Sequence, residues 1–264
     1  MNNTFNAKRF VLLFKKTLLE RPTQMFGFIG LILAIILILY FIMKTQVSFG
    51  AAQNISFIWG LAGGGCFLAS FVFSYFSSNA NGSSYLTLPA SHFEKWLCGV
   101  LIAGVLYPII FLVFYRLVDA GFVALFHNSL DPENPLYKEQ YKSVYIFSFT
   151  GRIAVKVYST SFLLMGVALL GSLYFNRAAF IKTALVFCAI CFGIFGLNWL
   201  FAELLFGNID GAFPFRDVGV LVGKEVGSVE LPKKAFTIVG YVIDYAIPVL
   251  LWALAFMRLR EKEF

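Results

Sequence analysis

Six long runs of apolar residues constrain this chain more than any other feature of its sequence. A helix of about 20 apolar residues crosses the hydrocarbon core of a bilayer. Lipid offers no hydrogen bonds to the backbone, so each run must satisfy its own N–H and C=O groups, which favours helices. We therefore expect an all-α polytopic membrane protein with six transmembrane helices. The expected crossings are residues 26–43, 55–76, 96–118, 153–175, 180–206 and 236–257.

The amino-acid composition agrees with a membrane protein and argues against two other classes. Of the 264 residues, 59% are hydrophobic and only 13% are charged, whereas about 25% of the residues in soluble domains are charged. A soluble fold of this length does not hide so much apolar surface from water. The net charge of +7 does not indicate a nucleic-acid partner, because the Lys and Arg residues flank the apolar runs and form no single basic stripe.

The distribution of Lys and Arg predicts the orientation in the membrane. The short segments before the first crossing, between the fourth and fifth crossings and after the sixth are mostly basic. Such segments stay in the cytoplasm, and an even number of crossings places both termini on one side. We therefore expect both termini to be cytoplasmic. The sequence shows no cleavable signal peptide and no eukaryotic sorting signal, so the expected location is a bacterial inner membrane.

Residues 5–21, before the first crossing, have the pattern of a basic amphipathic helix. A helix of this kind lies in the plane of an anionic lipid leaflet, and Pro22 permits the turn into the membrane. The alternative is a basic flank that only orients the first crossing. The two faces consist of Phe10, Val11, Phe14 and Leu18 on the apolar side and Arg9, Lys16 and Glu20 on the polar side.

Two long loops are expected on the outer side of a single membrane domain that covers residues 1–264. They are residues 119–151 and 208–235. The second loop contains two Val-rich runs around a Gly, which predicts a small β-hairpin.

Motifs for catalysis or for cofactor binding are weak in this sequence. The run GVLVGKEVG, from Gly219 to Gly227, resembles a phosphate-binding loop, but its glycines are too close and Glu225 replaces the required hydroxyl. His92 and His127 are expected on opposite faces of the membrane, so they cannot share a metal ion. We therefore expect no enzymatic activity, no catalytic residue, no metal and no cofactor in this chain.

Small residues predict where helices approach closely. Gly60 and Gly64 in the second crossing allow a neighbouring helix to pack against the backbone, as do Gly193 and Gly196 in the fifth. These positions suit packing within the bundle or a subunit interface.

Asp244 is a charged residue about two turns into the sixth crossing. Charges inside lipid are costly and often mark a substrate or ion pathway. The alternative is an ion pair near the outer interface, or a side chain that reaches to the headgroups. Asp244 is therefore a candidate for a substrate pathway.

A short polar segment, SSYLTLPASHFEKWL from Ser83 to Leu97, separates the second and third crossings. Ser91 and Glu94 have the spacing of a capping box, in which each side chain bonds the backbone N–H of the other residue. Pro89 keeps the residues before it out of that helix. We expect a short helical stub over residues 83–88, a break, and a helix that starts at Ser91. The apolar residues that this segment offers at the cytoplasmic surface are Tyr85, Leu86 and Leu88.

The residues from Leu86 to Lys95 resemble the Leu-Pro-x-Ser-x-x-Glu segment of ABC-2 type transporter permeases. In that family this segment joins the second and third of six helices and forms the coupling helix that docks on a cytoplasmic ATPase subunit. An in-plane elbow helix precedes the first crossing. The resemblance implies that the chain pairs with another permease half, as a homodimer or heterodimer, and exports a substrate with ATP hydrolysed by the ATPase subunit. It implies an ATPase-coupling segment made of Tyr85, Leu86, Leu88, Pro89, Ser91, Glu94 and Lys95.

Two other functions remain open from the sequence. A polytopic assembly or scaffold protein without transport activity has the same hydropathy pattern. An ion-coupled carrier would use Asp244 and need no ATPase.

Overall fold

The structure is a computed structural model that describes residues 5–20, 22–73, 75, 82, 84–85, 87–175, 177–222 and 225–262, with only the backbone of 23, 24, 222, 225 and 226. Among these residues, six helices are long and apolar enough to cross a membrane, which confirms the number predicted from the apolar runs. The six spans are Met25–Gln46, Phe49–Val72, His92–Asn128, Arg152–Tyr174, Ala179–Phe206 and Lys233–Arg260.

Three of the spans contain a wider, π-helical turn. The second span consists of α3 (Phe49–Ile58), η1 (Trp59–Gly64) and α4 (Gly65–Val72). The third consists of α6 (His92–Leu101), η3 (Ile102–Leu106) and α7 (Tyr107–Asn128). The sixth consists of α11 (Lys233–Tyr241), η4 (Val242–Ala246) and α12 (Ile247–Arg260). The other elements are α1 (Ala7–Glu20), α2 (Pro22–Gln46), α8 (Tyr137–Ser143), α9 (Arg152–Tyr174), α10 (Ala179–Phe206), β1 (Ile209–Phe213), β2 (Asp217–Val222) and β3 (Glu225–Glu230).

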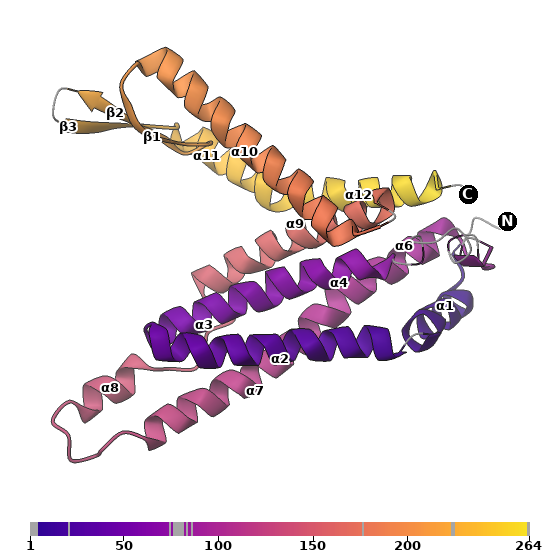
Figure 1. Cartoon of the computed structure of the whole chain (residues 1–264), viewed down its shortest axis with the longest axis horizontal. Helices are drawn as coiled ribbons and strands as arrows, with labels where there is room; N and C mark the ends of the chain where they lie inside the picture. Colours follow the sequence, from indigo (N-terminus) through magenta and orange to yellow (C-terminus); the bar gives the residue numbers. More distant parts are fainter. Residues whose placement is uncertain are drawn as a thin grey trace.

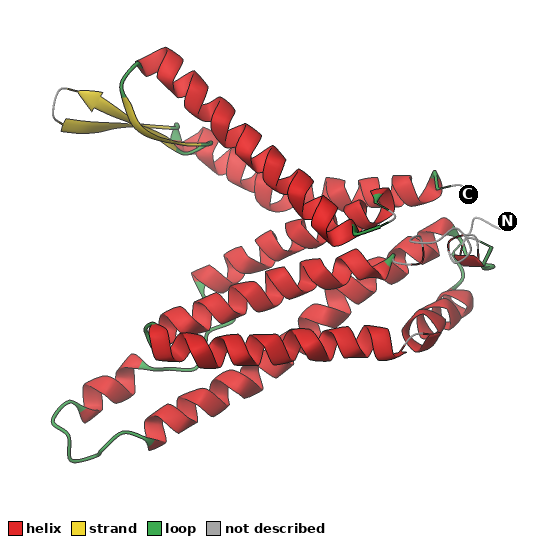
Figure 2. Ribbon diagram, viewed as in Figure 1, coloured by secondary structure: helices red, strands yellow, loops and turns green. Residues whose placement is uncertain are grey.

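The two ends of the molecule differ in what they carry. Both termini and the start of α6 lie at one end, whereas α8 and the three strands lie at the other (Figures 1 and 2). At the first end, the Nζ of Lys262 donates to the carbonyl of Leu173 at 2.9 Å, which ties the C-terminal tail to the end of α9. This arrangement is the one expected for an even number of crossings.

The third helix extends well beyond its predicted limits. The sequence placed an outer loop at residues 119–151, but α7 continues as a helix to Asn128, so this loop begins ten residues later than expected. The prediction stopped at Asp119 because a charge commonly ends a membrane span. In the structure the Asp119 side chain is fully buried and the helix continues past it.

The segment predicted as an outer loop, residues 208–235, contains a three-stranded antiparallel sheet with the order β1-β2-β3, and its last three residues begin α11. The predicted hairpin corresponds to β2 and β3, which pair from Asp217 with Glu230 to Val222 with Glu225. The prediction missed β1. Its sequence, IDGAF, combines Asp and Gly in five residues and lacks the apolar alternation that marks a strand.

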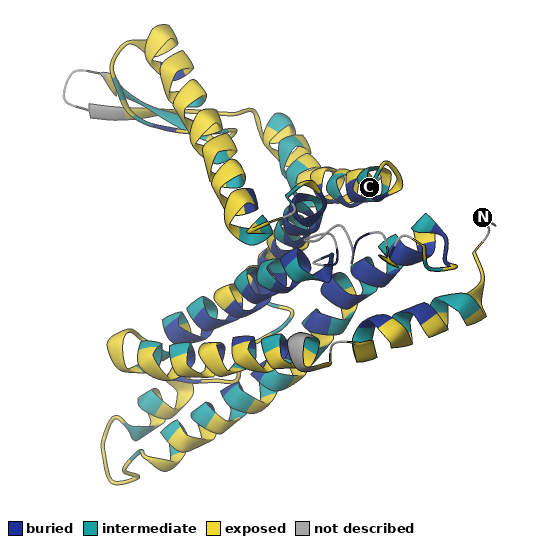
Figure 3. Ribbon diagram, turned by 45° about the vertical axis from the view of Figure 1, so that its right-hand side comes forward, coloured by how far each residue is buried: buried dark blue, intermediate teal, exposed yellow. Residues whose placement is uncertain are grey.

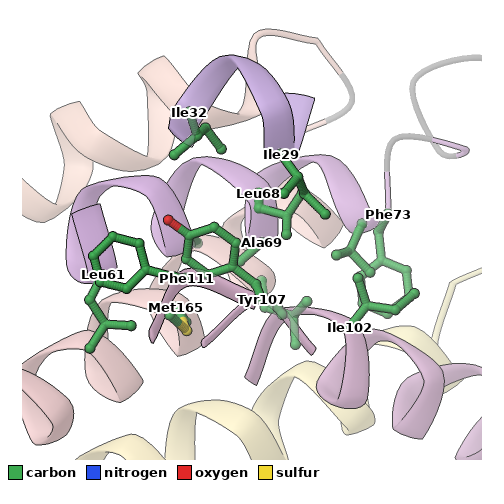
Figure 4. Close-up of a cluster of buried hydrophobic side chains, with 14 of the residues drawn as sticks. Ile29, Ile32, Leu61, Leu68, Ala69, Phe73, Ile102, Tyr107, Phe111 and Met165 are labelled. Carbon is green, nitrogen blue, oxygen red and sulfur yellow. The ribbon is translucent and has the colours of Figure 1, made fainter. Parts of the chain in front are cut away.

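The core lies between the first four spans and the sixth. Side chains from α2, η1, α4, η3, α7 and α9 meet there (Figure 4), and Trp252, Ala255 and Leu259 of α12 belong to the same cluster. Gly60 and Gly64 allow this packing, since an added Cβ would collide with Phe111 at Gly60 and with Tyr107 and Ile32 at Gly64. The hydroxyl of Tyr107 donates to the carbonyl of Gly60 at 2.5 Å. A π-helical turn such as η1 disturbs the regular pattern of backbone hydrogen bonds, and this contact supplies a donor to one of its carbonyls.

The fifth helix, α10, is the most exposed of the six (Figure 3). An added Cβ at Gly193 or Gly196 would meet no atom within 4 Å. The close packing expected at these two glycines is therefore not present within the described part of the chain.

Candidate functional site

The N-terminal helix α1 is separate from α2 and packs along the start of the third span. Leu13 and Thr17 are buried, and Phe10, Phe14 and Leu18 are partly buried against the core. Lys16 is exposed, as predicted. Val11 is 61% exposed, so it does not pack against the protein core with the other apolar residues of this helix.

A salt bridge joins α1 to α6. The Nη2 of Arg9 donates to Glu94 Oε1 at 2.7 Å, and the Nε of Arg9 donates to Oε2 at 2.8 Å. This hydrogen bonding to a carboxylate raises the pKa of Arg9 above its usual value. The planar guanidinium and the carboxylate are matched in a bidentate pair, which fixes orientation as well as distance. The sequence alone predicts for Arg9 only a place on the polar face of α1.

Glu94 also caps the N-terminus of α6, the helix in which it lies. Its Oε2 accepts from the backbone N–H of Ser91 at 2.8 Å, and the Ser91 hydroxyl accepts from the N–H of Glu94 at 3.2 Å, which confirms the predicted capping box. The N–H of Asn6 donates to Oε1 at 2.8 Å. The carboxylate is fully buried and each of its oxygens accepts two hydrogen bonds, so one side chain holds the N-terminus of α6 and the N-terminus of α1 together.

The link before Ser91 presents different residues from those predicted. Tyr85 is only 5% exposed and stacks on Tyr75, with ring centroids 4.8 Å apart. The prediction that Tyr85 is exposed at the surface is wrong, because its ring packs against Tyr75 of the same chain. Burial raises the pKa of Tyr85 well above its usual value, so the phenol stays neutral. Leu88 is partly buried against the core.

Among the described residues of this link, the exposed side chains are the polar Ser84 and Thr87 together with Pro89 and Phe93. Leu86 lies outside the described residues. Lys95 is fully buried, with its Nζ 5.8 Å from the centre of the Tyr85 ring. Lys95 therefore adds no charge to the surface of the link.

Asp244 forms an ion pair with Lys156 of α9. The Nζ of Lys156 lies 2.6 Å from Oδ1 and 2.7 Å from Oδ2, and the hydroxyl of Ser159 donates to Oδ1 at 3.3 Å. The Lys156 side chain is 63% exposed and the Asp244 side chain is 22% exposed. An ion pair was one of the alternatives that the sequence allowed for Asp244, and it is present. Both of its side chains are partly exposed.

A second buried carboxylate, Asp119, was missed by the sequence analysis. Its Oδ1 accepts from the Tyr40 hydroxyl and from Gln53 Nε2, both at 2.8 Å, and its Oδ2 accepts from the N–H of Phe147 at 2.7 Å. Gln53 Nε2 also donates to the carbonyl of Tyr145 at 2.8 Å. These bonds connect α2, α3, α7 and the segment after α8. The only local signal was the continuation of apolar residues past Asp119.

The remaining candidate motifs bring no ligands together. No group of three or more His, Cys, Asp or Glu side chains that could hold a metal ion occurs among the described residues. His127 stacks on Tyr141 near α8, with ring centroids 3.8 Å apart, at the opposite end of the molecule from His92. Gly219 lies in β2 and Gly227 in β3, and residues 223–224 between these strands lie outside the described residues.

No protein-family model, no curated protein and no solved structure matches this chain.

Proposed function

We propose that the chain is the membrane-spanning permease subunit of an ABC-2 type transporter in a bacterial inner membrane. It exports a substrate with ATP hydrolysed by a separate cytoplasmic ATPase subunit, and it pairs with a second permease half, identical or related. Both termini and the link between α4 and α6 face the cytoplasm in this proposal. The six apolar helices are compatible with this function.

The observation that carries the proposal is the position of Glu94. This buried carboxylate holds α1 through Arg9 and Asn6, and it caps a helical span that continues for 37 residues. A force applied to the link can move helices on the far side of the membrane only through stiff contacts. The salt bridge between α1 and α6, followed by a continuous helical span made of α6, η3 and α7, is such a contact.

The proposed docking surface for the ATPase is the exposed part of the link together with the first turn of α6. Pro89 restricts the backbone conformation of Leu88, the residue before it. Phe93, in the first turn of α6, is 42% exposed. An aromatic ring next to a rigid turn is a suitable anchor for a partner surface.

Site-specific crosslinking tests this surface. A photoreactive residue at Pro89 or Phe93, placed in the full-length chain in its native membrane, is expected to form an adduct with a protein that carries a P-loop ATPase sequence. The matched control is the same residue at Glu139, an exposed position of α8 at the opposite end. Adducts of equal yield at Glu139, or none at the link, contradict the proposal.

The two alternatives give different results in the same membranes. A scaffold protein gives no ATPase adduct and no ATP-dependent transport. An ion-coupled carrier is favoured by the accessible pair of Asp244 and Lys156, and it transports with an ion gradient in the absence of ATP.

A further inference from the structure

A groove opens between α9, α10 and the sixth span. Its volume is about 950 Å³, and its walls include Leu163 of α9, Val186 and Ile190 of α10 and Ile247 of α12. Volumes up to about 1,000 Å³ are typical of small-molecule sites. Along α9 the groove extends from Lys156 to Tyr174, a rise of about 27 Å. This length is close to the hydrocarbon thickness of a bilayer, about 30 Å.

The charged groups of the groove lie at one end. Lys156 and Asp244 lie there as an ion pair, and Ser159 adds a hydroxyl. Most of the remaining wall is aliphatic or aromatic, down to Tyr174 and Phe175. The groove is therefore charged at one end and apolar along most of its length, which matches the polarity of an amphiphilic ligand.

We propose that this groove binds a lipid whose head group contains both a phosphate and a primary ammonium, as in a phosphoethanolamine lipid. The acyl chain lies against Val186 and Ile190, the phosphate contacts Lys156, and the ammonium donates to Asp244. The proposal holds whether the lipid is exported or resident, so it does not depend on the transporter function.

The ion pair selects this head group over its relatives. Both charges are accessible to a ligand, and charge-assisted hydrogen bonds to each are the strongest polar contacts that the groove offers. An anionic lipid without an amine would satisfy Lys156 but be repelled by Asp244. A choline head group has no N–H to donate to the carboxylate. An apolar protein segment would fill the tail region but make no polar contact with Lys156 or Asp244.

Lipid binding to the purified full-length chain tests the head group. Native mass spectrometry after delipidation compares phosphatidylethanolamine, phosphatidylcholine and phosphatidylglycerol with identical acyl chains. We expect phosphatidylethanolamine to bind about tenfold more tightly than the other two, the effect of one charge-assisted hydrogen bond. Asp244→Asn should remove this preference, and Lys156→Met should weaken binding of all three. Equal binding of the three lipids, or an unchanged preference in Asp244→Asn, overturns the proposal.

A pair of neighbouring tryptophan variants tests the tail region. Val186 lines the groove and is 48% exposed, whereas Leu185 beside it is 65% exposed and is not part of the lining. Val186→Trp should reduce binding of every lipid, and Leu185→Trp should leave it unchanged. Neither site is in the packed core, and circular dichroism checks that both variants keep their helices. Equal effects of the two variants, or a protein dimer that Val186→Trp dissociates, overturn the proposal, because the second result assigns the groove to another copy of the chain.

Discussion

Arg9 and Glu94 are 85 residues apart in the sequence and form a two-point ion pair, with N–O distances of 2.8 and 2.7 Å. The same carboxylate closes the capping box at Ser91. The first turn of the third span is therefore held both by its own cap and by α1, which joins the two helices at this carboxylate.

Removing either partner of this pair should destabilise the protein. Glu94→Gln keeps the size of the side chain but removes its charge, and Arg9→Met removes the guanidinium but keeps an apolar stem. We expect each change to lower the melting temperature in detergent, and the double variant to lower it by less than the sum, because both changes break the same interaction. Lys16→Met, an exposed change on the same helix, is the control. Strict additivity would contradict the coupling.

Asp119 should be more important for stability than a surface carboxylate. Asp119→Ala leaves the Tyr40 hydroxyl, Gln53 and the N–H of Phe147 without this acceptor, at about 1–3 kcal/mol for each buried group left unpaired. The expected result is a large loss of thermal stability. Glu139→Ala, an exposed change in α8, should stay within about 0.5 kcal/mol of the original protein. Similar melting temperatures for the two variants would refute the role of the Asp119 network.

Two glycine-to-alanine changes should have opposite effects. At Gly64 the new methyl group would collide with Tyr107 and Ile32, which should cost about 1–3 kcal/mol of stability. At Gly193 the methyl group meets nothing within 4 Å, so the better helix propensity of alanine should stabilise by up to about 1 kcal/mol. Thermal unfolding in the same detergent measures both. A stabilising Gly64→Ala change would show that the core is packed differently.

Under the proposed function, Pro89→Gly should uncouple ATP hydrolysis from movement of the permease. Glycine gives the link many more backbone conformations, so the link bends where it would otherwise transmit force. Spin labels at Glu139 and Asp210, in a background without the four native cysteines, report distance changes on ATP binding in the reconstituted complex. We expect the change in the original chain and in Pro135→Gly, the control at the opposite end, but not in Pro89→Gly, which continues to hydrolyse ATP. A normal distance change in Pro89→Gly would exclude coupling through this turn.

Local patterns in the sequence were sufficient for some parts of the fold. Runs of about 20 apolar residues identified the six spans, and the spacing of Ser91 and Glu94 identified the start of α6, because both signals lie within one segment. The Val-rich runs likewise indicated β2 and β3.

Contacts between distant segments could not be predicted in this way. Nothing near Arg9 specifies Glu94 as its partner, and nothing near Tyr85 specifies that Tyr75 covers its ring. Asp119 was assigned to a loop because its charge was judged without the three donors that neutralise the cost of its burial. The apolar groove depends on how α10 diverges from α9, which no periodicity encodes.

The two buried carboxylates have a joint consequence for how this protein can move. Glu94 and Asp119 lie on one continuous helix, about 38 Å apart by the rise of 1.5 Å per residue. Each is fully buried and fixed by three hydrogen bonds from other segments. The helix is thus fixed to other segments at both ends. If it tilts, α1 must move with one end, and α2, α3 and residues 144–147 must move with the other.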